Sequence, residues 1–210
     1  MIMNDDAMKD LDTSYFNLTT EKLPVAGGSL IVAQPFLSDE WFGRAVISLI
    51  DCAPADGATG VVLNNRMDCT LREVLDGVGA PGDAVPVYCG GPLSHDRLYF
   101  IHTLGPDIIP GARLYAPGLY IGGEFSRAVA YVNEGYPAEG FLRFFIGYSG
   151  WTAGQLRDEM LADTWAPVAA PPDASSLLAG AGDAYWHAVV RLMGPRYRSW
   201  LAIPRDVRAN

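Results

Sequence analysis

One stretch of the chain, residues 147–156, constrains the fold more than any other. It has the sequence Gly-Tyr-Ser-Gly-Trp-Thr-Ala-Gly-Gln-Leu and joins the apolar run 141–146 to an amphipathic segment. The apolar run predicts a strand, and apolar residues at helical spacing after it predict a helix with one buried face. Thr152 followed by Gln155 matches a helix capping box. We therefore expect a strand that turns sharply into a helix through a buried, rigid turn.

Short β-prone runs outnumber amphipathic segments along the chain. Two patterns mark helix starts: Thr70 with Glu73, and Asp183 ahead of an apolar stripe that ends at Gly194 and Pro195. Because the predicted helices are scattered between hairpin-like pairs of strands, we predict an α+β domain rather than a doubly wound parallel sheet. The predicted strands cover residues 29–33, 44–50, 59–63, 86–89, 97–102, 114–115, 119–121, 141–146 and 165–169, and the predicted helices cover 71–78, 124–134, 153–164 and 183–193.

The composition allows one sizeable core and disfavours several classes of partner. The chain has 210 residues, 50% of them hydrophobic, and no stretch has the composition of a linker. A formal net charge of −9 repels phosphate backbones and argues against nucleic-acid binding by the molecule as a whole. No apolar stretch is long enough to span a bilayer, and the acidic first residues lack the apolar region of a secretory signal. We expect a cytoplasmic location and no membrane partner.

The chain divides into three predicted segments. Residues 1–23 are polar and acidic and are predicted to form a mobile arm. Residues 24–195 are predicted to form a single α+β domain. Residues 196–210 form a basic C-terminal extension, in which arginines alternate with Tyr197 and Trp200.

A loop that begins with Gly90 and Gly91 joins two predicted strands. The backbone N–H groups of a glycine pair can bind an anion, and Arg97 and His102 follow closely in the sequence. The alternative, that the glycines only turn the chain, is favoured because the loop lacks the lysine of a phosphate-binding loop and opens no helix. Cys89 and His102 would suit a nucleophile and its base, but free cysteines are usually buried and inert.

Residues that usually bind metals or carry catalysis show no productive spacing. The three cysteines form no C-x-x-C pair and the three histidines no ligand-like spacing, so no metal, disulfide or cofactor is predicted. Ser149 lacks the second glycine of a nucleophile elbow, and Glu159 has no paired acid. We assign no catalytic residue and favour a non-enzymatic function.

The arginines near the C-terminus allow another interpretation. With Tyr197 and Trp200 between them, they could hold nucleic acid by charge and base stacking. The alternative is that this end packs against the acidic first segment or seals the core through Trp200. We favour packing because the basic patch is short and the net charge opposes polyanions. The arginines concerned are Arg191, Arg196, Arg198, Arg205 and Arg208.

Six motifs occur in an order that resembles the AlgH/YqgE family of bacterial proteins, from residue 28 to residue 194. They are G-x-L-I-V-A-x-P at 28–35, F-x-R-x-V-I at 42–47, G-A-x-G-x-V-L-N at 57–64, V-Y-x-G-G-P at 87–92, D-R at 96–97 with His102, and G-Y-S-G-W-x-x-G-Q-L at 147–156. The resemblance implies a single α+β domain in which a bifurcated mixed sheet includes a small closed β-barrel and is flanked by helices. It also implies a cytoplasmic protein of unsettled molecular function, in a family commonly labelled as transcriptional regulators because of a genetic association.

The chain departs from the family pattern at three places. The usual proline is missing after Asn64, and the usual asparagine is missing before Trp165. Arg157 stands where the family usually has a glutamate, which reverses the charge at a helix start where the macrodipole prefers an acid. A departure that touches a ligand would change the ligand preference of this chain.

Together these patterns predict a cytosolic regulatory or interaction domain that binds a small anionic ligand or a protein partner. Two alternatives stay open: a hydrolase or transferase that acts on a phosphorylated or nucleotide substrate, and nucleic-acid binding through the C-terminal arginines. The residues predicted to line the binding cleft are Gly90, Gly91, Arg97, His102, Tyr148, Trp151 and Gln155.

Overall fold

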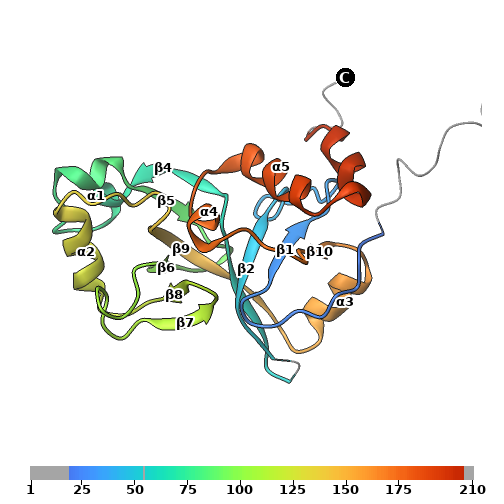
Figure 1. Ribbon diagram of the computed structural model, residues 1–210, viewed down its shortest axis with the longest axis horizontal. Coiled ribbons are helices and arrows are strands. Elements are labelled where there is room, and N and C mark those ends of the chain that lie inside the picture. Colours follow the sequence, from blue (N-terminus) through green and yellow to red (C-terminus); the bar gives the residue numbers. More distant parts are fainter. Residues whose placement is uncertain (1–18, 54, 206–210) are drawn as a thin grey trace, which may run out of the picture.

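The computed structural model describes residues 19–53 and 55–205. Of the predicted acidic arm, residues 1–18 lie outside the described residues, as does Arg208. Figure 1 shows β9 (Leu142–Trp151) in the middle of the molecule, with α1 and α2 on one side and α3 and α5 on the other. None of the helices in the described part of the chain has the length and apolarity needed to cross a bilayer.

The described strands form one branched sheet in an α+β domain. Its main path has the order β10-β1-β2-β3-β9-β6-β8-β7, and β4 and β5 form a branch that joins it at β9. The other strands are β1 (Leu30–Ala33), β2 (Val46–Ala53), β3 (Gly57–Val62), β4 (Arg66–Thr70), β5 (Pro86–Cys89), β6 (Leu93–His102), β7 (Arg113–Ala116), β8 (Leu119–Ile121) and β10 (Trp165–Pro167). The helices are α1 (Leu71–Val74), α2 (Phe125–Asn133), α3 (Gln155–Leu161), α4 (Ala174–Leu177) and α5 (Gly182–Leu192), with 3-10 turns η3 (Ala80–Ala84) and η4 (Pro195–Ala202).

Strand β9 is the element on which the sheet branches. Its first half lies between β5, which runs parallel to it, and β6, which runs antiparallel. Its last residues pair with β3 instead, with Trp151 opposite Ala58. A single long strand therefore connects two groups of strands that are distant in sequence.

The prediction of a small closed barrel is wrong, because the sheet is open between β7 and β2. Two side-chain contacts bridge this gap: Tyr115 Oη lies 3.1 Å from Ser48 Oγ, and Arg113 pairs with Asp51 at 3.0 Å. Strand β2 already forms hydrogen bonds with β1 on one edge and β3 on the other. Strand β1 covers only residues 46–48 of its edge, and among the described residues no backbone ladder joins β7 to β2.

Each of the nine predicted strands is present, but two of their connections differ from expectation. Residues 147–151 continue β9 rather than turning into a helix, because Gly147 adopts a φ of 74° and bends the strand without ending it. Strands β5 and β6 do not pair with each other, since β9 lies between them. Strand β4 was not predicted, and the helix predicted at 71–78 ends at Val74.

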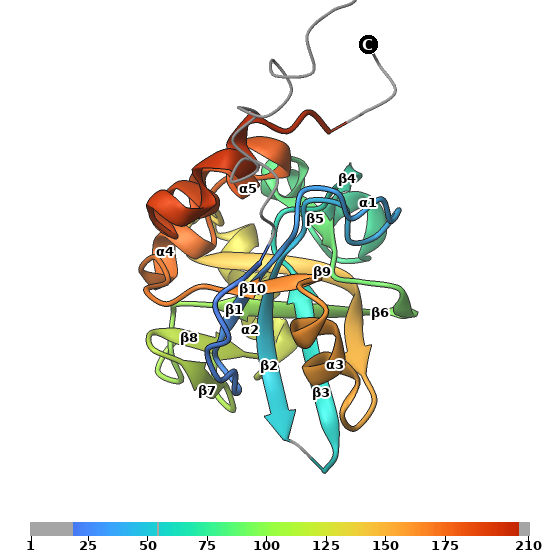
Figure 2. The same cartoon turned by 90° about the vertical axis from the view of Figure 1, so that its right-hand side faces the viewer.

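Strand β1 is buried on both faces, which explains its continuous apolar sequence. Leu30 and Val32 pack in a cluster with residues of α5 and η4, whereas Ile31 and Ala33 pack in a second cluster with residues of α3. Figure 2 shows α3 lying over the β2–β3 hairpin. A third cluster packs α1 and α2 against β5, β6 and β9.

Gly91 is predicted to contribute more to stability than a glycine that faces open space. A Cβ on Gly91 would lie 2.5 Å from the carbonyl carbon of Tyr148, at a φ of 144°. Gly77 has a φ of 82°, and a Cβ there meets nothing within 4 Å. Gly91→Ala should therefore lower the free energy of unfolding by about 3 kcal/mol or more, through strain and overpacking. Gly77→Ala should cost about 1 kcal/mol, through backbone strain alone.

Urea unfolding followed by tryptophan fluorescence measures both variants. A loss for Gly91→Ala that is no larger than the loss for Gly77→Ala would contradict the prediction.

Candidate functional site

The two glycine-rich motifs lie against each other, at a place we call the glycine crossing (residues 90–91 and 147–149). Gly90 N donates to Ile146 O at 2.9 Å, and Ser149 Oγ donates to Gly90 O at 3.0 Å. His95 Nε2 donates to Gly91 O at 2.7 Å. A Cβ on Gly90 would collide with the carbonyl oxygen of Gly147. The motifs thus meet backbone to backbone and fill the space between them.

The other predicted cleft residues lie in separate places. Tyr148 is half-buried at the glycine crossing, with its ring 5.9 Å from that of Tyr99, and Arg97 is exposed on β6. His102 is buried at the far end of β6, opposite the start of β9. Trp151 and Gln155 lie together at the opposite end of β9. The structure therefore brings Gly90, Gly91 and Tyr148 together, with Arg97 on the neighbouring part of β6, and separates them from His102, Trp151 and Gln155.

Trp151 and Gln155 share a partner, the carboxylate of Glu159. Its Oε2 accepts from the indole nitrogens of Trp151 at 2.8 Å and Trp165 at 2.7 Å, and its Oε1 accepts from Gln155 Nε2 at 2.9 Å. Gln155 Oε1 also accepts from Thr152 N at 3.0 Å, although Gly154 is the residue at the N-cap. These bonds fasten α3 to β9 and β10 and occupy the carboxylate that sequence reasoning considered as a lone base.

Cys89 and His102 do not form a catalytic pair. Cys89 lies opposite Ile146 and His102 opposite Leu142, which are four residues apart on β9, roughly 13 Å along a strand. Burial raises the pKa of the Cys89 thiol, so the thiol is protonated at neutral pH. Among residues 19–53 and 55–205, no group of three or more histidine, cysteine or acidic side chains is placed to hold a metal ion.

The basic C-terminal segment packs onto the domain. Tyr197 and Trp200 are buried in the first core cluster, so their rings are not free to stack on bases. Arg196 donates to Thr19 O at 3.0 Å, and Arg205 pairs with Asp183 at 2.8 Å.

A buried arginine that was not predicted lies beside this segment. Arg44 is only 4% exposed and has a φ of 55°, unusual for a residue with a side chain. Its Nη1 lies 3.2 Å from His187 Nε2 and 3.6 Å from Asp183, and its Nη2 donates to Ile203 O. Asp183 sits in the first turn of α5 rather than at its N-cap, where it balances Arg44 and Arg205. The cluster fastens residue 203 to the domain.

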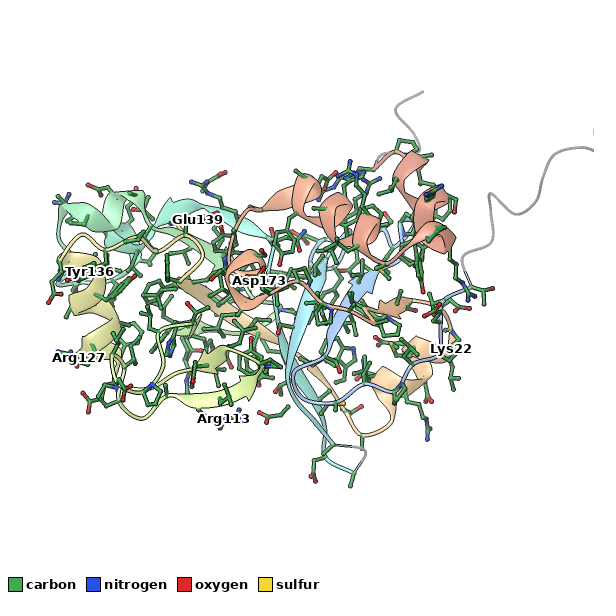
Figure 3. All side chains as sticks on the ribbon, in the orientation of Figure 1. Lys22, Arg113, Arg127, Tyr136, Glu139 and Asp173 are labelled. Atoms are coloured by element: carbon green, nitrogen blue, oxygen red, sulfur yellow. The ribbon has the colours of Figure 1, made fainter. Side chains whose placement is uncertain are left out.

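The described structure contains an apolar pocket of about 420 Å³. It lies between residues 22–25, which we call the strap, the β2–β3 hairpin and α3, and we call it the strap pocket. In Figure 3, Lys22 of the strap lies next to α3, at the opposite side of the molecule from Arg127 of α2. The pocket is lined by Lys22, Leu23, Pro24, Val25, Cys52, Ala53, Gly57, Ala58, Thr152, Gly154, Leu156, Arg157, Met160 and Leu161.

Asp163 holds the strap in place. Its Oδ1 accepts from Lys22 Nζ at 2.5 Å and from Thr20 N at 2.8 Å, and Lys22 Nζ also donates to Met160 O at 2.6 Å. Burial favours the neutral acid, but the hydrogen bonds from Lys22 and Thr20 outweigh it and lower the pKa of Asp163. The carboxylate is therefore charged at neutral pH and its bonds to the strap persist.

None of the seven predicted cleft residues lines the strap pocket. Ligand binding at those seven residues stays a prediction. Other residues of two sequence motifs do line the strap pocket, and so does Arg157, which departs from the family pattern. These motif residues are Gly57, Ala58, Thr152, Gly154 and Leu156.

The comparisons with known sequences agree with the motif order. A family model described as AlgH-like matches residues 30–198. A UPF0301 protein of Parabacteroides distasonis is 37% identical over 197 residues, which cover 94% of this chain and 98% of the relative. The UPF0301 protein BF2109 of Bacteroides fragilis is 30% identical over 201 residues, which cover 96% of this chain and 100% of the relative.

Two solved structures share the fold. Protein DIP2367 from Corynebacterium diphtheriae has a TM-score of 0.68 at 23% identity, over 88% of this chain and 95% of that protein. The solution structure of the AlgH protein from Pseudomonas aeruginosa has a TM-score of 0.66 at 24% identity, over 84% of this chain and 93% of that protein. At these identities the likeness establishes the fold.

His102 should make stability depend on pH. Its side chain is fully buried, with Nε2 donating to Gly122 O at 3.1 Å and Nδ1 without a partner. Burial lowers the pKa of His102. Above the unfolded-state pKa of about 6.5 both states are neutral. Below it the unfolded chain binds the proton first, so the free energy of unfolding falls as pH drops towards the folded-state pKa.

We expect the wild type to lose more stability between pH 7.5 and pH 5 than His102→Phe, which keeps a ring but cannot titrate. Urea unfolding at each pH measures the difference. Equal losses in the two proteins would rule out His102 as the source.

Proposed function

Because the chain belongs to the AlgH-like family and carries a well-formed apolar pocket, we propose that it is a regulatory domain that binds a small molecule in the strap pocket. The observation that carries the proposal is the pocket itself. Its volume of about 420 Å³ lies within the range of roughly 300–1,000 Å³ common for small-molecule sites.

The construction of the pocket supports a binding role. Its walls come from three segments far apart in sequence: the strap, the β2–β3 hairpin and α3. Leu156 and Met160 pack in the second core cluster behind the pocket, and the Glu159 carboxylate fixes α3 to two tryptophans. Such a preformed wall lowers the ordering cost of binding a ligand.

The alternative of an enzyme draws less support from this pocket. Among the residues that line the pocket, Cys52 carries the thiol that could act as a nucleophile. Burial raises the pKa of the Cys52 thiol, and its Sγ lies 3.9 Å from Val25 O. A protonated thiol with a carbonyl neighbour is a poor nucleophile, so the pocket suits binding better than covalent chemistry.

The test introduces a large side chain into the strap pocket and measures whether ligand binding is lost. Ala53 lines the pocket and is half-buried at the end of β2, so Ala53→Trp should occupy the space without unfolding the chain. Ala130 is also half-buried but lies on α2, and Ala130→Trp is the matched control. A thermal-shift screen of a metabolite library on the full chain should give a ligand that stabilises the wild type and Ala130→Trp but not Ala53→Trp.

The melting temperature of each variant without ligand checks its folding. A ligand that stabilises folded Ala53→Trp as strongly as the wild type would place binding elsewhere and contradict the proposal.

A further inference from the structure

We propose that the strap pocket is selective for an amphipathic anion: a molecule with an apolar chain and one carboxylate, whose charge Arg157 binds. This inference rests on the proposed function, and it names the ligand class of the same site. It rests on two observations. The charged residues that line the pocket, Lys22 and Arg157, are cations, and the side chain of Arg157 is exposed to solvent.

The charged residues that line the strap pocket are both cations. Lys22 and Arg157 lie at its rim, and no carboxylate is among its lining residues. This is unlike the chain as a whole, which has a formal net charge of −9. Cationic side chains with no carboxylate among the lining residues favour an anionic ligand over a cationic one at this place.

The charge of Lys22 is already used within the protein. Its Nζ is bound by Asp163 and by the carbonyl oxygen of Met160 at the end of α3. A ligand that took Lys22 would have to release the strap. Asp163 therefore largely neutralises the charge of Lys22, and a ligand carboxylate must find its direct partner elsewhere.

Arg157 is that partner. Its side chain is 76% exposed and pairs with Asp158, the next residue, at 3.1 Å, with Asp158 itself 68% exposed. An exposed pair of this kind contributes little stability, so the guanidinium can exchange Asp158 for a ligand carboxylate at little cost. Its Nη2 lies 3.7 Å from the place of a Cβ on Gly154, a residue that lines the pocket. A guanidinium can bind a carboxylate through two parallel hydrogen bonds.

The position of Arg157 favours a binding role over a structural one. It lies in the first turn of α3, where the helix macrodipole disfavours a cation. Leu23, Val25 and Met160 supply the apolar surface beyond it. A ligand with an apolar body and a single charged end matches both parts, whereas a polyphosphate would leave its charges against apolar walls.

The experiment compares octanoate with 1-octanol, which have the same chain length and differ in charge. Isothermal titration calorimetry on the full chain at pH 7.5 should give octanoate an affinity about ten-fold higher than that of 1-octanol. Arg157→Gln should remove this preference and leave the affinity for 1-octanol unchanged, and Arg157→Glu should reverse it. Arg127→Gln, an exposed arginine on the opposite side of the molecule, is the matched control and should behave as the wild type (Figure 3).

The outcomes separate the two proposals. Equal affinities in the wild type, or a preference for octanoate that survives Arg157→Gln, would overturn the inference and leave the pocket as a binding site. If neither octanoate nor 1-octanol binds the wild type, the inference fails, and a library ligand that is lost only in Ala53→Trp would still support the proposed function.

Discussion

The contact between backbones at the glycine crossing is the constraint on which the rest of the structure depends. Gly90 O accepts from Val62 N at 3.0 Å and from Ser149 Oγ at 3.0 Å, while Gly90 N donates to Ile146 O at 2.9 Å. One residue thus links the end of β3, the end of β5 and the middle of β9. A side chain at this position would hold the three strands apart, so only glycine allows β9 to pass from β5 to β3.

The course of β9 in turn positions the strap pocket. Because its last residues pair with β3, β9 delivers the chain to the end of the β2–β3 hairpin, and α3 folds back over that hairpin. The two indoles on Glu159 hold α3 there, and Asp163, just after the end of α3, holds the strap through Lys22. Polar contacts at or beyond the edge of the pocket therefore fix the strap and α3, which leaves the interior apolar.

The arginines of the chain serve two different purposes. Arg143 is 2% exposed, donates to Leu63 O at 2.5 Å and to Gly180 O at 3.0 Å, and has its guanidinium 4.1 Å from the ring centre of Tyr88. Burial lowers the pKa of Arg143, yet carbonyl oxygens and an aromatic face compensate for its loss of water. Arg44 is buried in a similar way, and both arginines join distant segments. Arg157 is exposed and held only by its neighbour, which is why it suits a ligand.

The sequence by itself determined most of the elements and the family. Short β-prone and apolar runs located nine strands, apolar spacing located α2 and α5 to within a residue or two, and the order of glycine-rich motifs identified the relatives. These are local signals, and a local pattern reports which residues are buried but not against which partner. The tertiary structure alone decided that Gly147 bends β9 instead of ending it, that β9 separates β5 from β6, and that the barrel stays open. It also decided where the strap pocket forms. The strap and α3 are more than a hundred residues apart in the sequence, and they meet the β2–β3 hairpin only when the sheet has formed.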